Sequence, residues 1–151
     1  MLFRSLASNV LFLKEPKALD FQKRKQQYYS SLREGRSAIV YQSVYPFEGN
    51  SWKVKCGDKQ FGSGELVRDT AGCVAKVQTP VTPFSKVILL VRNGEVSQEV
   101  ESEKNSNETL TIPLGAAGTY RVEVWAKMHS AMRISMNRLV PYVFYNPIYL
   151  Q

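Results

Sequence analysis

Residues 110–125 read Leu-Thr-Ile-Pro-Leu-Gly-Ala-Ala-Gly-Thr-Tyr-Arg-Val-Glu-Val-Trp, and this stretch decides the predicted fold. Apolar and polar side chains alternate on both sides of a corner that carries Gly115 and Gly118. A period of two places alternate side chains on one face, which indicates two half-buried strands. Tyr120 follows the corner. Its hydroxyl can bond back to the corner backbone, as in the tyrosine corner of some β-sandwiches, or it can be a plain core tyrosine.

Other strands are expected on both sides of this stretch. Asn93-Gly94 predicts a two-residue hairpin turn, and Asn146-Pro147 interrupts a final strand that ends at Leu150. The remaining strands are expected at residues 38–45, 52–56, 65–68, 73–78, 86–92 and 95–100. About seven or eight short strands predict a mostly β fold, an immunoglobulin-like antiparallel β-sandwich with an N-terminal helical segment. We assign the sandwich to residues 37–151.

Residues 1–36 form a separate N-terminal segment in this prediction. The spacing of Phe21, Tyr28 and Leu32 predicts an amphipathic helix over residues 16–34 that ends at Gly35. Its apolar face, with Leu11 and Leu13, is expected to cover the sandwich or a partner protein. Membrane-surface binding is the weaker alternative. Residues 9–13 form either a short strand or a helical turn.

A methionine-bearing segment follows Trp125. Met128, Met132 and Met136 recur every four residues, and Leu139 follows them. This spacing is typical of a short helix that packs on its own domain, or of an adaptable contact surface.

Charge and cysteine content narrow the class of function. The chain of 151 residues has a net charge of +7, and five of those charges fall in residues 1–36. The sandwich is therefore nearly neutral, which argues against nucleic-acid binding. No apolar run is long enough to span a membrane, and the absence of a clear signal peptide favours the cytoplasm. Cys56 and Cys73 could pair across a sheet, but the sequence favours free buried thiols.

The chain is poor in groups that could perform catalysis. His129 is the only histidine, and it has no nearby metal ligands in the sequence. Glu99, Glu101 and Glu103 share one face of a strand and repel each other. We therefore expect no enzyme activity, metal or cofactor. A ligand-binding module, for example for carbohydrate, is an alternative in which Trp52, Trp125 and Tyr145 would form an aromatic platform.

Three stretches in order resemble the C-terminal part of metal-dependent phosphoesterases of the polymerase and histidinol phosphatase (PHP) type. Residues 32–36, Leu-Arg-Glu-Gly-Arg, resemble the end of the catalytic barrel, and residues 118–125 resemble the penultimate strand of the small sandwich that follows it. Residues 145–149, Tyr-Asn-Pro-Ile-Tyr, are similar to the closing Ser-Asn-Pro-Ile-Tyr of those tails, although Val143-Phe144 replaces the usual Trp-Ile. The predicted hairpin at Arg92-Asn93-Gly94 also resembles those tails.

The resemblance implies an accessory domain without catalytic residues. The histidine and carboxylate clusters that bind metal ions in this family do not occur in the sequence. Residues 1–36 would then include the last strand and helix of a preceding barrel. The expected partner is a catalytic barrel domain or subunit, contacted through the N-terminal segment.

Overall fold

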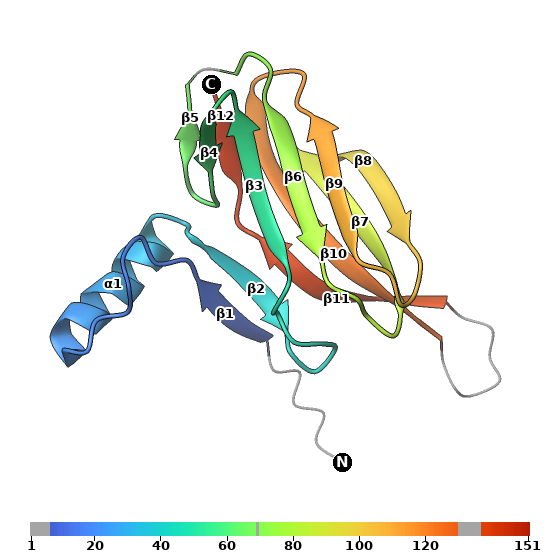
Figure 1. Ribbon diagram of the computed structural model, residues 1–151, viewed down its shortest axis with the longest axis horizontal. Helices are drawn as coiled ribbons and strands as arrows, with labels where there is room; N and C mark the ends of the chain where they lie inside the picture. The colour runs from blue at the N-terminus through green and yellow to red at the C-terminus, as the bar shows by residue number, and fades with distance from the viewer. Residues whose placement is uncertain (1–6, 69, 130–136) are drawn as a thin grey trace.

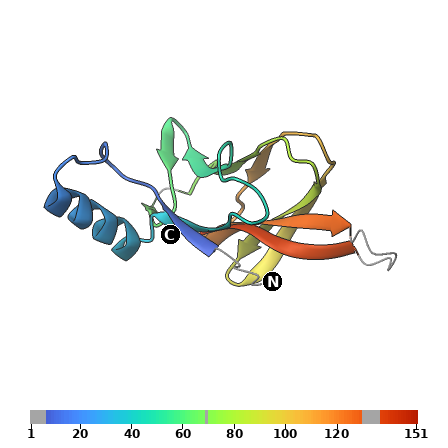
Figure 2. The same cartoon turned by 90° about the horizontal axis from the view of Figure 1, so that it is seen from below.

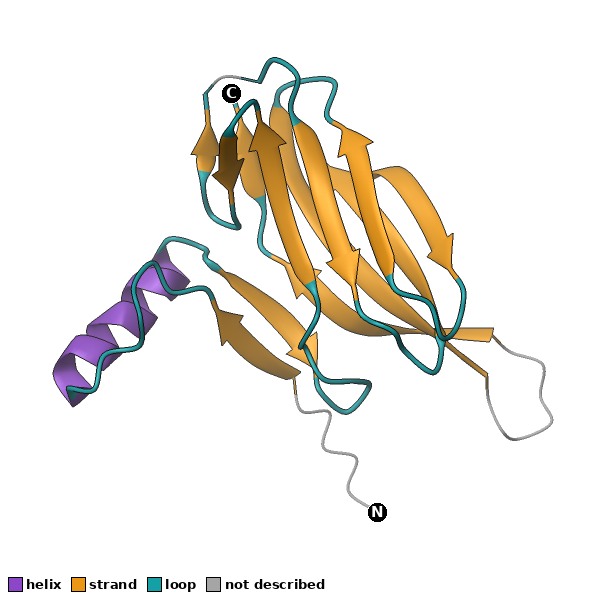
Figure 3. Ribbon diagram, in the orientation of Figure 1, coloured by secondary structure: helices purple, strands orange, loops and turns teal. Residues whose placement is uncertain are grey.

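The part of the chain that the structure describes folds into one helix and two β-sheets. The computed structural model describes residues 7–68, 70–129 and 137–151, and the helix is α1 (Phe21–Arg33). The strands in these ranges are β1 (Ala7–Leu11), β2 (Ser37–Tyr41), β3 (Ser51–Cys56), β4 (Lys59–Phe61), β5 (Leu66–Val67), β6 (Val74–Thr79), β7 (Ser85–Arg92), β8 (Glu95–Ser102), β9 (Glu108–Pro113), β10 (Gly118–His129), β11 (Asn137–Tyr145) and β12 (Ile148–Leu150). The prediction of a mostly β fold is confirmed (Figure 3).

The two sheets form a sandwich. The small sheet has the order β4-β3-β6-β9 and lies in front of β7 and β10 in Figure 1. The large sheet has eight strands in the order β1-β2-β11-β10-β12-β5, and β7 joins β10 and β8. All pairs are antiparallel except β12 with β5. The sequence predicted fewer strands because β4 is too short to show a hydrophobic period, and because the sequence shows β11 and β12 as one strand interrupted at Asn146-Pro147.

The core lies between the facing surfaces of the sheets. In β10, Val122 and Val124 are fully buried, whereas the alternating residues Arg121 and Glu123 are half-buried and form an ion pair of 2.7 Å. The small sheet contributes buried side chains to the same cluster: Trp52, Val54, Ala75, Val77 and Ile112. The alternation expected in residues 110–125 is therefore present, and it sets which side chains enter the core.

The predicted corner and the predicted hairpin are joined to each other. Tyr120 is buried, and its hydroxyl donates to the carbonyl of Ala116 at 2.8 Å, which confirms the tyrosine corner. Asn93 and Gly94 both have positive φ, as a tight hairpin requires. The side chain of Asn93 accepts from the backbone of Thr119 at 2.8 Å, and a Cβ at Gly118 would crowd this side chain. Hydrogen bonds thus fix the β7–β8 turn against the start of β10.

Cys56 and Cys73 form a disulfide, so the expectation of free thiols was wrong. Lys55 lies opposite Val74 in the antiparallel pair of β3 and β6, and the cysteines are the next residues outward. The sequence showed two neighbouring strands but not their register, which is what makes the bond possible.

The helix predicted from the methionine spacing was also wrong where the structure describes it. Met128 lies in β10 and Leu139 in β11, and these strands pair with each other as a hairpin. A spacing of four also satisfies a period of two, so the pattern could not separate helix from strand. Met132 and Met136 lie outside the described residues. His129 ends β10 opposite Asn137.

Replacing Tyr120 with Phe tests the tyrosine corner. The variant keeps the buried ring and loses the hydrogen bond to Ala116, so we expect the free energy of unfolding to fall by about 1 kcal/mol. Urea unfolding followed by tryptophan fluorescence measures the change. Tyr149→Phe is the matched control, because Tyr149 is 41% exposed, and its effect should stay within about 0.5 kcal/mol. Equal effects of the two variants would contradict the structural role of the corner.

Candidate functional site

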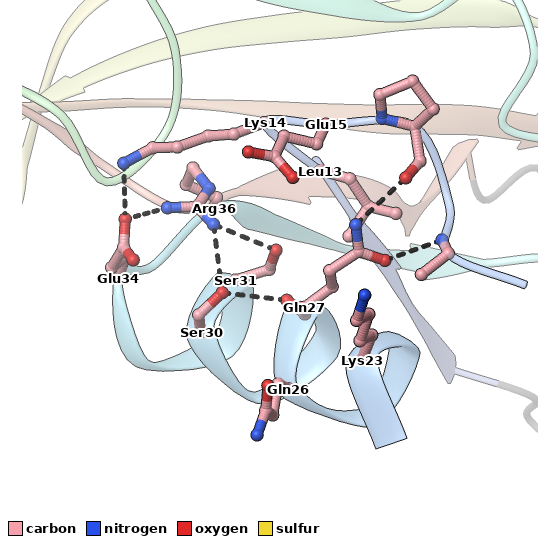
Figure 4. A pocket seen from close by; sticks show the side chains of 12 residues that line it. Leu13, Lys14, Glu15, Lys23, Gln26, Gln27, Ser30, Ser31, Glu34 and Arg36 are labelled. Carbon is pink, nitrogen blue, oxygen red and sulfur yellow. Dashed lines mark hydrogen bonds and ion pairs between the residues drawn. The ribbon is translucent and has the colours of Figure 1, made fainter. Parts of the chain in front are cut away.

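Helix α1 begins later than the sequence predicted because Asp20 caps it. The Asp20 carboxylate accepts from the backbone of Lys23 at 2.9 Å, so the helix starts at Phe21. The preceding residues run beside the helix and are held by Gln27. Its side chain donates to the carbonyl of Pro16 at 3.0 Å and accepts from the backbone of Ala18 at 2.9 Å (Figure 4). One glutamine therefore fixes the incoming chain to the middle of the helix.

Gly35 stops the helix just after its last residue, Arg33, as predicted. Gly35 has φ +68° and donates its backbone N–H to Leu32, while Arg36 donates to Ser31. This pair of bonds is a Schellman motif, in which a left-handed residue closes the last turn. The chain then enters β2 at Ser37, so the helix is connected to the large sheet without a flexible linker.

Buried Arg36 holds the helix end against the segment that follows β1. Its guanidinium pairs with Glu34, which also pairs with Lys14 at 2.9 Å. The same guanidinium donates to the carbonyl of Phe12 at 3.2 Å and to the hydroxyl of Ser31 at 3.2 Å. These groups line one end of an open groove of about 690 Å³ between helix α1 and residues 13–18 (Figure 4).

The loop after β4 approaches the same helix end closely. Gly64 has φ +85°, and its backbone donates to the carbonyl of Pro147 at 2.7 Å. A Cβ on Gly64 would overlap the carbonyl of Glu34. Only glycine therefore fits between the helix end and the turn that separates β11 from β12. The loop that carries Gly64 therefore supports the end of the helix.

The predicted apolar face of helix α1 does not pack on the sandwich. Phe21 is 62% exposed and Leu32 is 46% exposed, while Tyr28 is half-buried. Ser31 is the one buried residue of the helix. Figures 1 and 2 show the helix projecting from one end of the molecule. The expectation that this face covers the chain's own sandwich was wrong, because the helix end is held by polar and backbone contacts.

Positive charge surrounds this apolar face. Helix α1 carries Lys23, Arg24, Lys25 and Arg33 and has no acidic residue. The guanidinium of Arg24 lies over the ring of Phe21 at 5.9 Å, and the ammonium of Lys25 lies over the ring of Tyr29 at 5.7 Å. The exposed surface thus combines aromatic rings with cations. We call Phe21, Tyr28, Tyr29 and Leu32 the docking face.

The other proposed interaction residues lie elsewhere. Met128 is half-buried and packs against the core, far along the chain from the docking face. Asn146 and Pro147 form the turn between β11 and β12, where Asn146 donates to the hydroxyl of Ser37 at 2.9 Å. The aromatic platform was a wrong expectation for Trp52 and Tyr145, because both are buried. Trp125 packs on Phe144 with ring centroids 5.0 Å apart.

Two lysines of the described residues make contacts that hold strands and loops together. Glu101 pairs with Lys127 at 3.0 Å. Buried Lys86, which the sequence did not single out, donates to the carbonyls of Pro80 at 2.6 Å and Ser106 at 2.8 Å. Burial lowers the pKa of Lys86. No group of three or more potential metal ligands and no helix able to cross a membrane occurs in residues 7–68, 70–129 and 137–151.

Comparison with known proteins finds no protein-family model and no curated protein that matches this chain.

Replacing Gly64 with Ala tests the contact that supports the helix. The variant combines a left-handed backbone with an overlap against Glu34, so we expect a loss of about 3 kcal/mol in unfolding free energy. Gly57→Ala is the matched control, because Gly57 has φ +56° and open space around its Cβ position. It should cost about 1 kcal/mol. Urea unfolding compares the variants, and equal losses would mean that Gly64 does not make this contact in solution.

Proposed function

We propose that this chain is a non-catalytic docking module that presents helix α1 to the catalytic barrel of a PHP-type metal-dependent phosphoesterase. The observation that carries the proposal is the exposed docking face, with Phe21 at 62% and Leu32 at 46% exposure. Exposed side chains of this size gain about 25 cal/mol for each Å² of apolar surface that a partner covers. Hydrophobic residues grouped on one exposed helix face are typical of an interaction surface.

The fixed ends of the helix support this proposal. Asp20 caps the start, and the Schellman motif at Gly35 and the Arg36 contacts hold the end. A helix held at its end presents one arrangement of side chains, so a partner does not bear the full entropic cost of ordering it. Strand β1 precedes helix α1 and strand β2 follows it. Because these two strands pair with each other in the large sheet, the helix is attached to that sheet at both ends.

The chemistry of the helix indicates the kind of partner surface. Four cations and no acidic residue favour a partner face that is apolar at its centre and acidic at its rim. The resemblance of residues 32–36 to the end of a PHP barrel supplies the identity that we propose for that partner. In such an assembly the docking face would lie against the barrel. An interaction module for another protein is the alternative, and the burial of Trp52 and Tyr145 disfavours an exposed sugar platform.

The test measures binding to a purified PHP-type barrel from the same genome, without its own C-terminal tail, by isothermal titration calorimetry. We expect Phe21→Ser combined with Leu32→Ser to weaken binding by about 100-fold or more, because buried aromatic and aliphatic anchors carry most interface energy. The stability of this exposed double variant should stay within about 0.5 kcal/mol of the wild type. Val81→Ser combined with Val96→Ser is the matched control, because both valines are more than half exposed and lie outside the helix.

Two results would contradict the proposal. The first is no binding of the wild-type chain to the barrel, or equal binding by the docking-face variant and the control. The second is binding to vesicles of anionic lipid, lost in the docking-face variant, without binding to the barrel. That result would assign the basic, aromatic helix to a membrane surface.

A further inference from the structure

The large sheet has a face that the small sheet does not cover. In Figure 2 the small sheet lies above the large sheet, and helix α1 lies beyond one end of it. Among the described residues, no helix or strand covers the face of the large sheet that points away from the small sheet. We call this the outer face. Side chains alternate along a strand, so the outer face consists of the residues that alternate with the core residues.

The strand register shows which side chains share the outer face. In β10, Trp125 lies between the core residues Val124 and Ala126, so it points outward. Residues directly opposite each other in a sheet point to the same face, so the register extends this assignment to the neighbouring strands. The apolar side chains of the outer face include Ile39 of β2, Leu89 of β7, Trp125 of β10, and Leu139, Pro141 and Phe144 of β11.

This apolar set is open to solvent in part. Leu139 is 48% exposed and Ile39 is 41% exposed, while Trp125 and Phe144 are half-buried. The outer face therefore presents apolar surface from β2 across to β7. A continuous apolar surface of this kind is typical of an interaction site. The apolar face of a sheet is stably buried when another layer, commonly a helix, packs on it.

Helix α1 has the complementary surface. Its docking face is apolar and exposed, and its four cations stand without an acidic residue on the helix. Strand β8, the edge strand beside β7, carries three glutamates and no cation, and the register places Glu99 and Glu101 on the outer face. An apolar centre with an acidic rim fits a basic, apolar helix. Because Arg36 and Gly64 hold the helix end beyond its own sheet, the matching face comes from another molecule.

We propose that helix α1 of one copy docks on the outer face of a second copy of this chain. The docking face would cover the apolar side chains of the outer face, and the helix cations would lie near the glutamates of β8. The helix and the outer face are different surfaces, so the contact is heterologous and can repeat from copy to copy. This inference uses the docking face of the proposed function, and a barrel would compete with the second copy for it. Its test contains no barrel, so the two proposals can fail separately.

Sedimentation velocity of the full chain over a range of concentrations measures the association. We expect a monomer at about 1 µM and an average mass that rises through the dimer between about 10 and 500 µM, because one helix on one sheet is a small interface. Raising NaCl from about 50 mM to about 500 mM should weaken the association about threefold or more, because salt screens exposed charges.

Two variants each remove one half of the contact. The helix variant combines Phe21→Ser with Leu32→Ser, and the sheet variant combines Ile39→Lys with Leu139→Lys. All four side chains are more than 40% exposed, so both variants should fold, and the thermal midpoint checks this. Each variant alone should associate about tenfold more weakly or less, because it lacks the apolar anchors on one side. Val81→Ser is the matched control, because Val81 is 53% exposed and lies in neither surface.

A mixture of the two variants gives the decisive result. The intact helix of the sheet variant can dock on the intact outer face of the helix variant, so the equimolar mixture should associate about as strongly as the wild type and stop at the heterodimer. A wild-type chain that stays monomeric at about 500 µM would overturn the proposal. So would a helix or sheet variant that associates like the Val81→Ser control, or a mixture that stays monomeric.

Discussion

The structure depends on the pairing of strand β10 along both of its edges. One edge pairs with β7 from Tyr120 to Lys127, and the other pairs first with β12 and then with β11. The Asn146-Pro147 turn lies where the second edge changes partner. Every strand of the large sheet is therefore connected through β10, either directly or by one or two further pairs. The tyrosine corner and the Asn93 bonds fix the start of this strand.

The strand pairing around β10 also determines where helix α1 is held. β11 pairs with β2, and β2 follows the helix after only a Schellman turn and Arg36. The helix end is thus positioned by the central sheet, and Gly64 brings the loop after β4 against it. The apolar face of the helix stays exposed because its anchoring contacts are made by its end and by polar groups. A rigid connection with an exposed apolar face is what a docking element requires.

The sequence predicted features that rest on local chemistry. The Asn93-Gly94 hairpin, the stop at Gly35 and the bond of Tyr120 each depend on a few neighbouring residues, and each is confirmed. Features that depend on distant pairing were missed. The disulfide follows from the register of β3 with β6, and the bond from Arg36 to Phe12 joins residues 24 positions apart. The amphipathic pattern correctly indicated an apolar helix face, but a pattern cannot show whether the partner is the same chain.

The apolar outer face of the large sheet could not be predicted either, because its side chains come from separate strands that only the register of the sheet brings together. The sequence selected Trp52 and Tyr145 for their flat rings but assumed that they were exposed.

Hydrogen exchange of the free chain tests the central claim, that helix α1 stands outside the sandwich core. We predict that amides of β10 and β7 exchange only through global unfolding, whereas amides of residues 24–30 exchange through local opening at a much lower free energy. Addition of the barrel should then slow exchange in the helix and leave β10 unchanged. Helix amides protected as strongly as those of β10 in the free chain would contradict the account.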